Sequence, residues 1–416
     1  MARRLPHSMS NPLHNLPPHL ERPFVRPFQP VPVNNKEGQT MALLRDPAGL
    51  GGQSMIVPPQ VLGLLAQFRG EESLQEIFER LNVPAEAHEQ LLEMVKKLDE
   101  LGYLWGPTSE ALEKKRMEEI RARGAFPVAD DARKPEVVQQ LRTFITEQLA
   151  KADDPEFDRP VVGIVAPHLD YGRGAANYGA AYKCLETGAR EKPDRIVVLG
   201  TNHFGIGDGV VMSEFGFETP FGTVRPDTKI LERLRDAFGE KLFKDQLDLA
   251  GEHSVALHLP WIQHLYGDVP VVAALVPDPN VGLLEDDGAR VGTKEFATAL
   301  RTILDQAGGR TLFVSSADLS HKGPQFGDQT RIDPAARNAI EQYDREMLGE
   351  FLGGPDSFVG HFSRHGNPNR WCSVGNMYAT MVAAPHGQRE MVNYDQSVDP
   401  NGVVLVSSAA LALLGA

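Results

Sequence analysis

The sequence predicts an α/β fold, a sandwich with a largely parallel central sheet, preceded by a small winged-helix-like α+β domain. From about residue 160 onward, short apolar runs typical of buried strands alternate with helical segments. Three of these runs lead into a loop that carries a histidine. A short series of helical segments before residue 108 predicts the additional domain.

Composition and charge narrow the class of protein. The chain has 416 residues, 41% hydrophobic and 24% charged, which is ordinary for a globular protein. Its net charge of −14 disfavours nucleic acid or an anionic membrane as the main partner. With only Cys184 and Cys372 there is no disulfide framework, and a reducing compartment is indicated. Without an apolar run of membrane length or a secretory signal, we expect a cytoplasmic protein.

The first part of the chain predicts a leader and a small domain. Residues 1–36 are rich in proline, and we expect them to be disordered. Residues 37–108 predict three helices followed by a short wing strand. One helix opens at Ser73 with Glu76 three residues later, a capping-box pattern. This part resembles the small PqqD-like domains, and the resemblance implies a protein partner. DNA binding is disfavoured because the third helix carries few basic residues.

The remaining elements follow in order. Residues 109–159 predict a helical connector, and residues 160–416 predict the α/β domain. Strands are expected at 161–166, 195–200, 209–213, 270–276, 311–316, 390–396 and 402–408. Helices are expected near 174–187, 227–238, 252–266, 292–307, 333–352 and 371–384.

Polar side chains follow three of the expected strands. His168 follows the strand at 161–166, His203 follows the next, and Asp318 and His321 follow the strand at 311–316. In open α/β sheets, ligands bind outside the carboxyl ends of the strands. We therefore expect these four side chains in one pocket, and a metal site is the interpretation that imidazole ligands favour.

The segment from Gly251 adds two candidates at the start of a helix. Glu252 is expected to accept a hydrogen bond that orients a ligand histidine. Asp170, in the loop after His168, is a second candidate for such an orienting role. His253 is expected in or near the site as an acid or base. The spacing is not His-Glu-x-x-His, so a zinc protease is not indicated.

Asp318, His321 and Cys372 could carry further chemistry. The acid and the histidine, three residues apart, could act as ligand and base or as a proton relay. Ser315 and Ser316 lack the Gly-x-Ser-x-Gly surroundings of a serine hydrolase. Cys372 opens an apolar helix, where a helix N-terminus favours the thiolate that binds metals. Its alternative is a buried packing cysteine.

Residues 160–416 together resemble the Memo family, known in bacteria as AmmeMemoRadiSam system protein B. The segments that carry the resemblance are Ala-Pro-His168, Leu-Gly-Thr-Asn-His203, Thr219-Pro-Phe-Gly, Glu-His253-Ser, Ser-Ser-Ala-Asp318-Leu-Ser-His321 and Cys372. The family fold is similar to that of the extradiol ring-cleaving dioxygenases. The resemblance implies one iron or copper ion per chain, held by His168, His203 and Cys372, with Asp318 and His321 beside it. Leu169-Asp170 and Ser373 depart from the family pattern and would change the shape of the pocket.

Three hypotheses follow. The first is a metalloprotein with redox or O₂-linked chemistry at the two histidines and the cysteine. The second is a non-haem iron dioxygenase with His321 or His253 as general acid or base. The third is a non-catalytic module whose pocket holds a small molecule or peptide, while the N-terminal domain recruits a partner protein.

Overall fold

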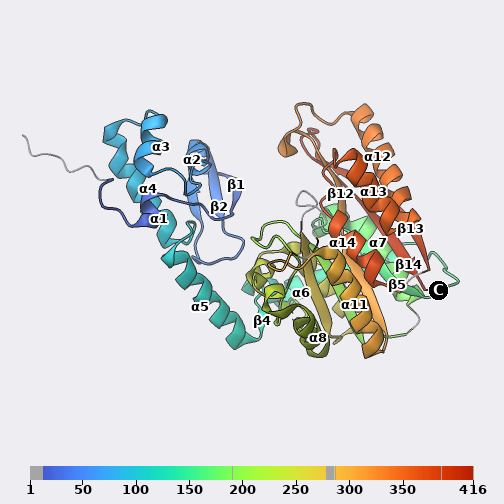
Figure 1. Cartoon of the computed structure of the whole chain (residues 1–416). Coiled ribbons are helices and arrows are strands. Elements are labelled where there is room, and N and C mark those ends of the chain that lie inside the picture. Colours follow the sequence, from blue (N-terminus) through green and yellow to red (C-terminus); the bar gives the residue numbers. More distant parts are fainter. Residues whose placement is uncertain (1–12, 190, 278–284, 286, 386, 416) are drawn as a thin grey trace, which may run out of the picture. The chain divides into compact units, whose positions relative to one another are not determined.

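A computed structural model describes residues 13–189, 191–277, 285, 287–385 and 387–415 (Figure 1). The chain divides into two compact units, Met1–Ala122 and Arg123–Ala416. Each unit has its own buried apolar cluster.

The first unit combines a small antiparallel sheet with short helices. Its sheet has the order β1-β2-β3, from β1 (Gln29–Asn34), β2 (Thr40–Arg45) and β3 (Met55–Val57). Its helices are α1 (Pro18–Glu21), α2 (Pro59–Leu65), α3 (Leu74–Arg80), α4 (His88–Glu100) and α5 (Pro107–Arg123). The capping box predicted at Ser73 is present, with Glu76 as its second member.

Part of the expected leader is ordered into this unit. Within residues 13–36, α1 forms, and β1 pairs along its whole length with β2. Leu13 and Leu20 are buried in the apolar cluster of the unit. The prolines of this segment suggested disorder, but proline is compatible with an edge strand such as β1. Proline lacks a backbone N–H, and on an edge strand an N–H that faces solvent has no partner strand to bond. Residues 1–12 lie outside the described part of the chain.

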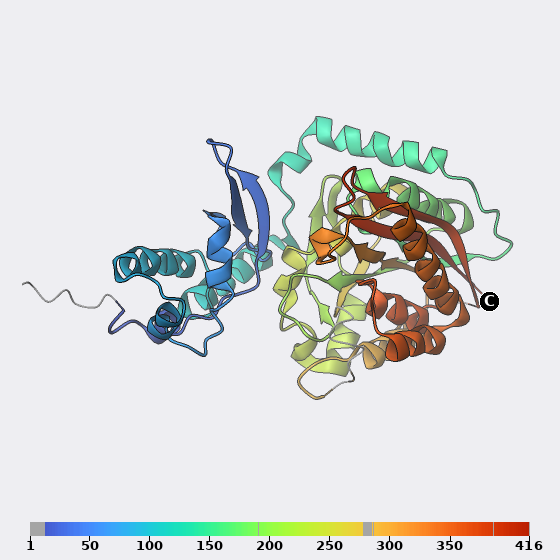
Figure 2. The same ribbon diagram turned by 90° about the horizontal axis from the view of Figure 1, so that it is seen from above.

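The second unit is built on an eight-stranded sheet whose centre is parallel. Figure 2 shows helices lying around the strands of this unit. The parallel centre has the order β5-β11-β6-β10, from β5 (Val161–Ala166), β11 (Thr311–Ser316), β6 (Arg195–Asn202) and β10 (Val271–Pro277). Antiparallel strands flank it: β7 (Val211–Met212) on one side, and β14 (Leu405–Leu414), β12 (Asp318–Lys322) and β13 (Gln388–Val398) on the other. The predicted α/β class with a largely parallel sheet is confirmed.

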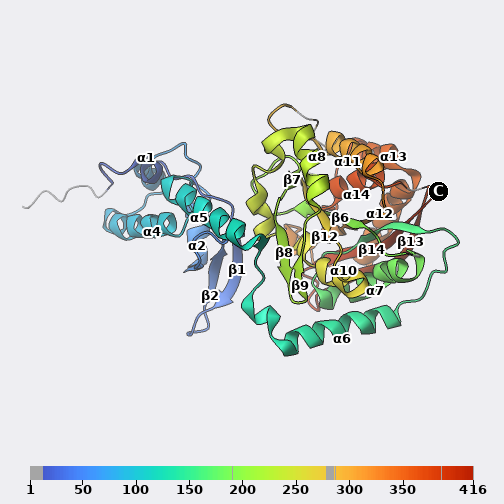
Figure 3. The ribbon, with the colours of Figure 1, turned by 90° about the horizontal axis from the view of Figure 1, so that it is seen from below.

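Helices cover both faces of this sheet (Figure 3). One layer contains α6 (Pro135–Lys151), α7 (Tyr171–Gly188), α9 (His253–Ala256) and α10 (Leu259–Tyr266). The other contains α8 (Thr228–Phe238), α11 (Thr293–Ala307) and α14 (Val374–Ala383), with α12 (Pro334–Gly353) and α13 (Pro355–His365) beside them. A second sheet of order β4-β8-β9 joins Ala125–Phe126, Gly216–Thr219 and Gly222–Val224. Short 3₁₀ turns lie at Ala85–Ala87, Asp130–Arg133, Gly239–Leu242, Gln246–Ala250 and Pro324–Phe326.

Two local predictions for this unit were wrong. The single helix expected at 252–266 is divided into α9 and α10, because Pro260 has no N–H to donate to the carbonyl oxygen of Ala256, four residues earlier. The segment from Asp318 was expected to be a loop, yet it forms β12 and pairs with β14. That pairing fixes the backbone of Asp318 and His321 at the edge of the site.

Two strands of this sheet, the parallel β10 and the antiparallel β14, are buried along their whole length. This burial is expected of strands covered on both faces. Within the described ranges, no helix has both the length and the hydropathy of a membrane span.

Candidate metal centre

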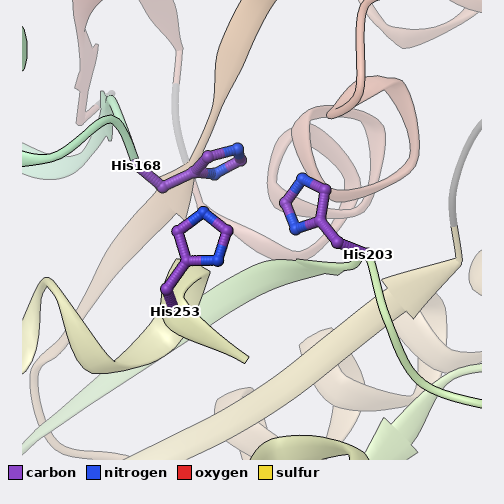
Figure 4. A group of neighbouring side chains, drawn as sticks. All are labelled: His168, His203 and His253. Carbon is purple, nitrogen blue, oxygen red and sulfur yellow. The ribbon is translucent and has the colours of Figure 1, made fainter. Parts of the chain in front are cut away.

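The carboxyl ends of β5 and β6 bring two histidines together. Both strands run parallel to β11, which lies between them, so their ends meet at one edge of the sheet. His168 follows β5 after one proline, and His203 follows β6 directly. Their ring centroids lie 4.8 Å apart (Figure 4).

His253 completes a cluster of three imidazoles. It is the first residue of α9, and its ring centroid lies 5.4 Å from that of His168 and 5.1 Å from that of His203. One ligand nitrogen from each ring lies within 4.8 Å of the other two. Figure 4 shows the three side chains converging from three different segments. The His253 side chain is 42% exposed, so it forms the solvent-facing side of the cluster.

The protein fixes the tautomer of His168. Its Nδ1 lies 3.2 Å from the carbonyl oxygen of Ser316, which can only accept, so Nδ1 carries the proton. The backbone N–H of His168 donates to Asp318 Oδ1 at 3.0 Å. Burial lowers the pKa of His168 well below its usual value, and the nearby His203 and His253 add to the shift. His168 is therefore neutral and presents the Nε2 lone pair that a metal requires.

Glu252 orients the other two histidines. Its buried carboxylate accepts from the backbone N–H of His203 at 2.9 Å and from His203 Nδ1 at 3.1 Å. It also lies 3.1 Å from His253 Nδ1 and caps α9 through the N–H of Ser254. A carboxylate on the far ring nitrogen fixes the orientation of an imidazole and raises its basicity as a ligand. Glu252 thus has the contacts expected of an orienting acceptor.

These contacts shift the pKa values of both partners. Burial alone would raise the pKa of Glu252, but hydrogen bonds from His203 and His253 hold it well below the usual range. Burial alone would lower the pKa of His203, but its hydrogen bonds to Cys372 and Glu252 raise it well above the usual value. The carboxylate is therefore charged, and a metal would displace a proton from His203 on binding.

Cys372 lies inside the same cluster. Its Sγ is 3.3 Å from His168 Nε2 and 3.2 Å from Ser373 Oγ. Cys372 precedes Ser373, the N-cap residue of α14, as the sequence indicated. The expectation of a lowered thiol pKa is wrong: burial raises the pKa of Cys372, although the hydrogen bond to His203 opposes that shift.

Asp318 and His321 border the cluster from β12. Asp318 Oδ2 lies 3.5 Å from His168 Nε2, and burial raises the pKa of Asp318 to about 6. Burial lowers the pKa of His321 to about 4, and the charges of His321 and His203 interact. His321 Nδ1 lies 3.0 Å from the carbonyl oxygen of Leu319, so this nitrogen is the donor. At pH 7 His321 is therefore neutral, whereas Asp318 is mostly ionised and gains a proton as the pH falls through about 6.

Two further residues bear on the site. Asp170, considered as an orienting residue, is the N-cap of α7 and pairs with Arg173, so its polar contacts serve the helix. Asn376 was not singled out from the sequence, yet its Nδ2 donates to the Ser316 carbonyl that holds His168. A buried asparagine in the first turn of an apolar helix is the signal that could have found it.

The donor set matches transition-metal chemistry. Nitrogens of the three histidines lie within 4.8 Å of one another. Cys372 Sγ and Asp318 Oδ2 lie 3.3 Å and 3.5 Å from His168 Nε2. Imidazole suits iron, copper and zinc, and a thiolate favours the softer of these ions. The residues present therefore fit a bound transition-metal ion, iron and copper included.

Comparisons with known proteins agree on one family. The sequence model of the family described as "Memo-like protein" matches residues 132–413. A MEMO1 family protein of Aquifex aeolicus is 27% identical over 331 residues, covering 79% of this chain and 81% of the relative. A MEMO1 family protein of Thermus thermophilus is 30% identical over 279 residues, covering 67% and 78%. One from Thermotoga neapolitana is 29% identical over 231 residues, covering 53% and 77%.

Proposed function

The chain belongs to the Memo-like protein family, and from this membership and the histidine cluster we propose that it is a metalloprotein. It binds one redox-active iron or copper ion through His168, His203 and Cys372. Bound iron or copper supplies one-electron redox chemistry, or chemistry linked to O₂. The observation that carries the proposal is the contact between Cys372 Sγ and His168 Nε2 at 3.3 Å within the imidazole cluster.

The protein's own residues hold the ligands and exclude water. Ser316 and Glu252 fix the two ring orientations from behind, so both Nε2 atoms are available on the same side. His168 is 2% exposed and Cys372 is 9% exposed, so solvent reaches these two ligands little. Low exposure strengthens charge interactions within the site.

Asp318 and His321 would handle protons beside the ion. With its pKa raised to about 6, Asp318 can hold or release a proton near neutral pH. His321 is neutral at pH 7, since burial lowers its pKa to about 4, and it can accept a proton through its free ring nitrogen. His253, the exposed member of the cluster, is a third candidate for acid–base work.

A second ligand set has its own support. Nitrogens of His168, His203 and His253 lie within 4.8 Å of one another, so His253 could replace Cys372 as the third ligand. An all-nitrogen set suits zinc, copper or iron. The second hypothesis, a non-haem iron dioxygenase with His321 as acid or base, needs a carboxylate beside two histidines, and Asp318 Oδ2 lies 3.5 Å from His168 Nε2. The two sets share two histidines and differ in one residue each.

Metal content measured on matched variants tests the proposal. The wild type, Cys372→Ser and His253→Gln are purified without added metal, and each is also reconstituted anaerobically with Fe(II) and with Cu(I). We expect a stoichiometric ion in the wild type and in His253→Gln, and a strong loss in Cys372→Ser.

The opposite pattern would assign the third ligand to His253. Absence of metal from all three proteins after reconstitution would overturn the proposal and favour the non-catalytic binding module. Circular dichroism of each variant controls for folding.

A further inference from the structure

A buried carboxylate outside the histidine cluster connects two of its segments. Asp344 lies on α12 and is fully buried. Its Oδ1 accepts from Ser320 Oγ at 2.5 Å and from Trp371 Nε1 at 2.8 Å. Its Oδ2 accepts from Ser407 Oγ at 2.5 Å and from Tyr394 OH at 2.8 Å. Four donors therefore converge on one side chain.

Two of these donors are the immediate neighbours of proposed site residues. Ser320 precedes His321 on β12, and Trp371 precedes Cys372. We propose that Asp344 is a positioning residue, which fixes the segment of Cys372 and the segment of His321 relative to each other. The inference rests on the proposed function, in which those two residues act at one metal site.

The geometry of the two segments supports this role. The loop before Cys372 runs beside β12, where the N–H of His321 donates to the carbonyl oxygen of Asn369 at 2.8 Å. Asn367 holds the backbone of Trp371 on both sides, at 2.8 Å from its N–H and 2.8 Å from its carbonyl oxygen. The indole N–H of Trp371 then reaches Asp344, so the loop is anchored at the residue next to the thiol.

The other side of the carboxylate is tied to the sheet. Ser407 lies on β14, and its hydroxyl also accepts from the backbone N–H of Ser320 at 2.9 Å. Tyr394, the fourth donor, lies on β13. Asp344 therefore links both site segments to the antiparallel strands β13 and β14 through hydrogen bonds.

The chemistry of the group argues against simple packing. Burial raises the pKa of Asp344, and the four hydrogen bonds oppose that shift. All four donors are uncharged, so no salt bridge accounts for a carboxyl group at this depth. An apolar side chain of similar volume would cost less desolvation free energy, whereas a carboxylate gives directional, charge-assisted hydrogen bonds.

Three variants separate the links of this network. Asp344→Asn keeps the shape and removes the charge. Trp371→Phe removes the indole N–H by which the Cys372 segment reaches Asp344, together with part of a fully buried ring. Ser320→Ala removes only the hydroxyl by which the His321 segment reaches Asp344. Asp227→Asn is the control, because Asp227 is 11% exposed, accepts from Arg195 Nε at 3.0 Å and lies by the start of β6, at the opposite edge of the sheet.

Two measurements report on the position of the Cys372 thiol: its alkylation rate and its ligation of Co(II). In the metal-free protein with Cys184→Ala, the alkylation rate with iodoacetamide measures the environment of Cys372 alone. In Co(II)-loaded protein, the near-ultraviolet sulfur-to-cobalt band and the dissociation constant measure ligation. We expect Asp344→Asn and Trp371→Phe to raise the alkylation rate several fold and the Co(II) dissociation constant by about 10- to 100-fold. The double variant should add little to either single one.

The outcomes separate this inference from the proposed function. Alkylation rates of Asp344→Asn and Trp371→Phe that match the Asp227→Asn control, at equal helical content, would overturn the positioning role. A wild-type protein that binds Co(II) without the sulfur band would overturn cysteine ligation, while the alkylation rates would still decide the role of Asp344.

Discussion

The Sγ atom of Cys372 lies 3.3 Å from Nε2 of His168, although 204 positions separate the two residues in the sequence. The contact joins the end of β5 to the start of α14. A metal ion held by both atoms would cross-link these elements only in the folded state. Metal binding at this proposed site would therefore be coupled to folding of the second unit.

This coupling predicts the effect of metal removal. A ligand at 100 times its dissociation constant stabilises a folded protein by about 2.7 kcal/mol. We expect anaerobic Fe(II) or Cu(I) to raise the unfolding temperature of the wild type, and a chelator to reverse the rise. Calorimetry measures both. Cys372→Ser should show a much smaller rise, and an equal rise in that variant would argue against the thiol as a ligand.

Glu252 gives the second prediction. Its carboxylate accepts from two imidazoles and two backbone N–H groups. In Glu252→Gln an amide group faces donors, and a buried donor without a partner costs about 1–3 kcal/mol. We expect a loss of that size in unfolding free energy and a rise of about 10- to 100-fold in the metal dissociation constant. Urea unfolding and metal titration measure the two effects.

Glu218→Gln is the matched control for this prediction. Glu218 lies on β8 of the second sheet, and its side chain is 10% exposed. It forms ion pairs with Arg123 and Arg133. We expect its replacement to leave metal affinity unchanged. Equal affinity losses in the two variants would mean that Glu252 acts through stability alone.

The third prediction concerns the close approach of α9 to β6. A Cβ at Gly200 would lie 2.4 Å from Ser254 Oγ, and that hydroxyl bonds both the N–H and the carbonyl oxygen of Thr201. Gly200→Ala must therefore push α9 outward, and Glu252 and His253 move with it. We expect a loss of about 1–3 kcal/mol in unfolding free energy, as for other overpacked sites, together with weaker metal binding.

Gly349→Ala is the control for added volume alone. Gly349 lies on α12, is exposed, and has no neighbouring atom within 4 Å of an added Cβ. Alanine is preferred over glycine in a helix by up to about 1 kcal/mol. This variant should gain stability and keep its metal affinity. Wild-type affinity in Gly200→Ala would show that the position of α9 is not important for the site.

The strand-end histidines could be predicted because their signal is local. An apolar run that leads into His168 or His203 marks the carboxyl end of a buried strand, and parallel strands share that edge. The pairing of Glu252 with a histidine could also be predicted from the sequence. Glu252 caps the start of α9, and this helix start was expected at the sheet edge where the strand-end histidines lie. The family signal adds the order of the short motifs along residues 132–413.

The network of Asp344 could not be predicted in this way. Its partners come from β12, β13, β14 and the loop before α14, and register between distant segments is set by tertiary packing. Nothing in the sequence around Asp344 distinguishes it from a solvated acid on an amphipathic helix. The same holds for β12, whose polar sequence becomes a strand only because β14 lies beside it.

A pH-dependent contribution to stability is predicted at Asp328. Its carboxylate lies 2.7 Å from Arg370 Nη2 and 3.2 Å from Lys322 Nζ, and the hydrogen bond from Arg370 holds its pKa well below the usual range. A group with a lowered folded pKa stabilises the protein above its unfolded pKa of about 3.9, and that contribution is lost as the pH falls below it. Asp328→Asn should therefore be less stable than the wild type at pH 7.

The gap between the two proteins should narrow as the pH is lowered from about 5 to about 3, through the unfolded pKa of an aspartate. Urea unfolding midpoints at several pH values measure this difference. Asp287→Asn is the comparison for an exposed acid whose pKa is lowered to about 2 by Arg290. A gap at Asp328 that stays constant with pH would mean that the ion pairs do not stabilise the fold.

The last prediction tests whether the segment before residue 37 stabilises the first unit, as an ordered part of it would, or contributes nothing, as expected of a disordered leader. Leu20 lies on α1, is 7% exposed and belongs to the apolar cluster of the first unit, and α1 packs on α3 and α4. Truncation of a buried leucine costs about 2–5 kcal/mol, whereas a change at an exposed position stays within about 0.5 kcal/mol. We expect Leu20→Ala to accelerate amide hydrogen exchange in α3 and α4, and Leu81→Ala, at a 42% exposed position, to leave it unchanged. Exchange in residues 123–416 should be the same in both variants. If Leu20→Ala behaved like Leu81→Ala, the residues before 37 would add nothing to the stability of the unit, as expected of a leader.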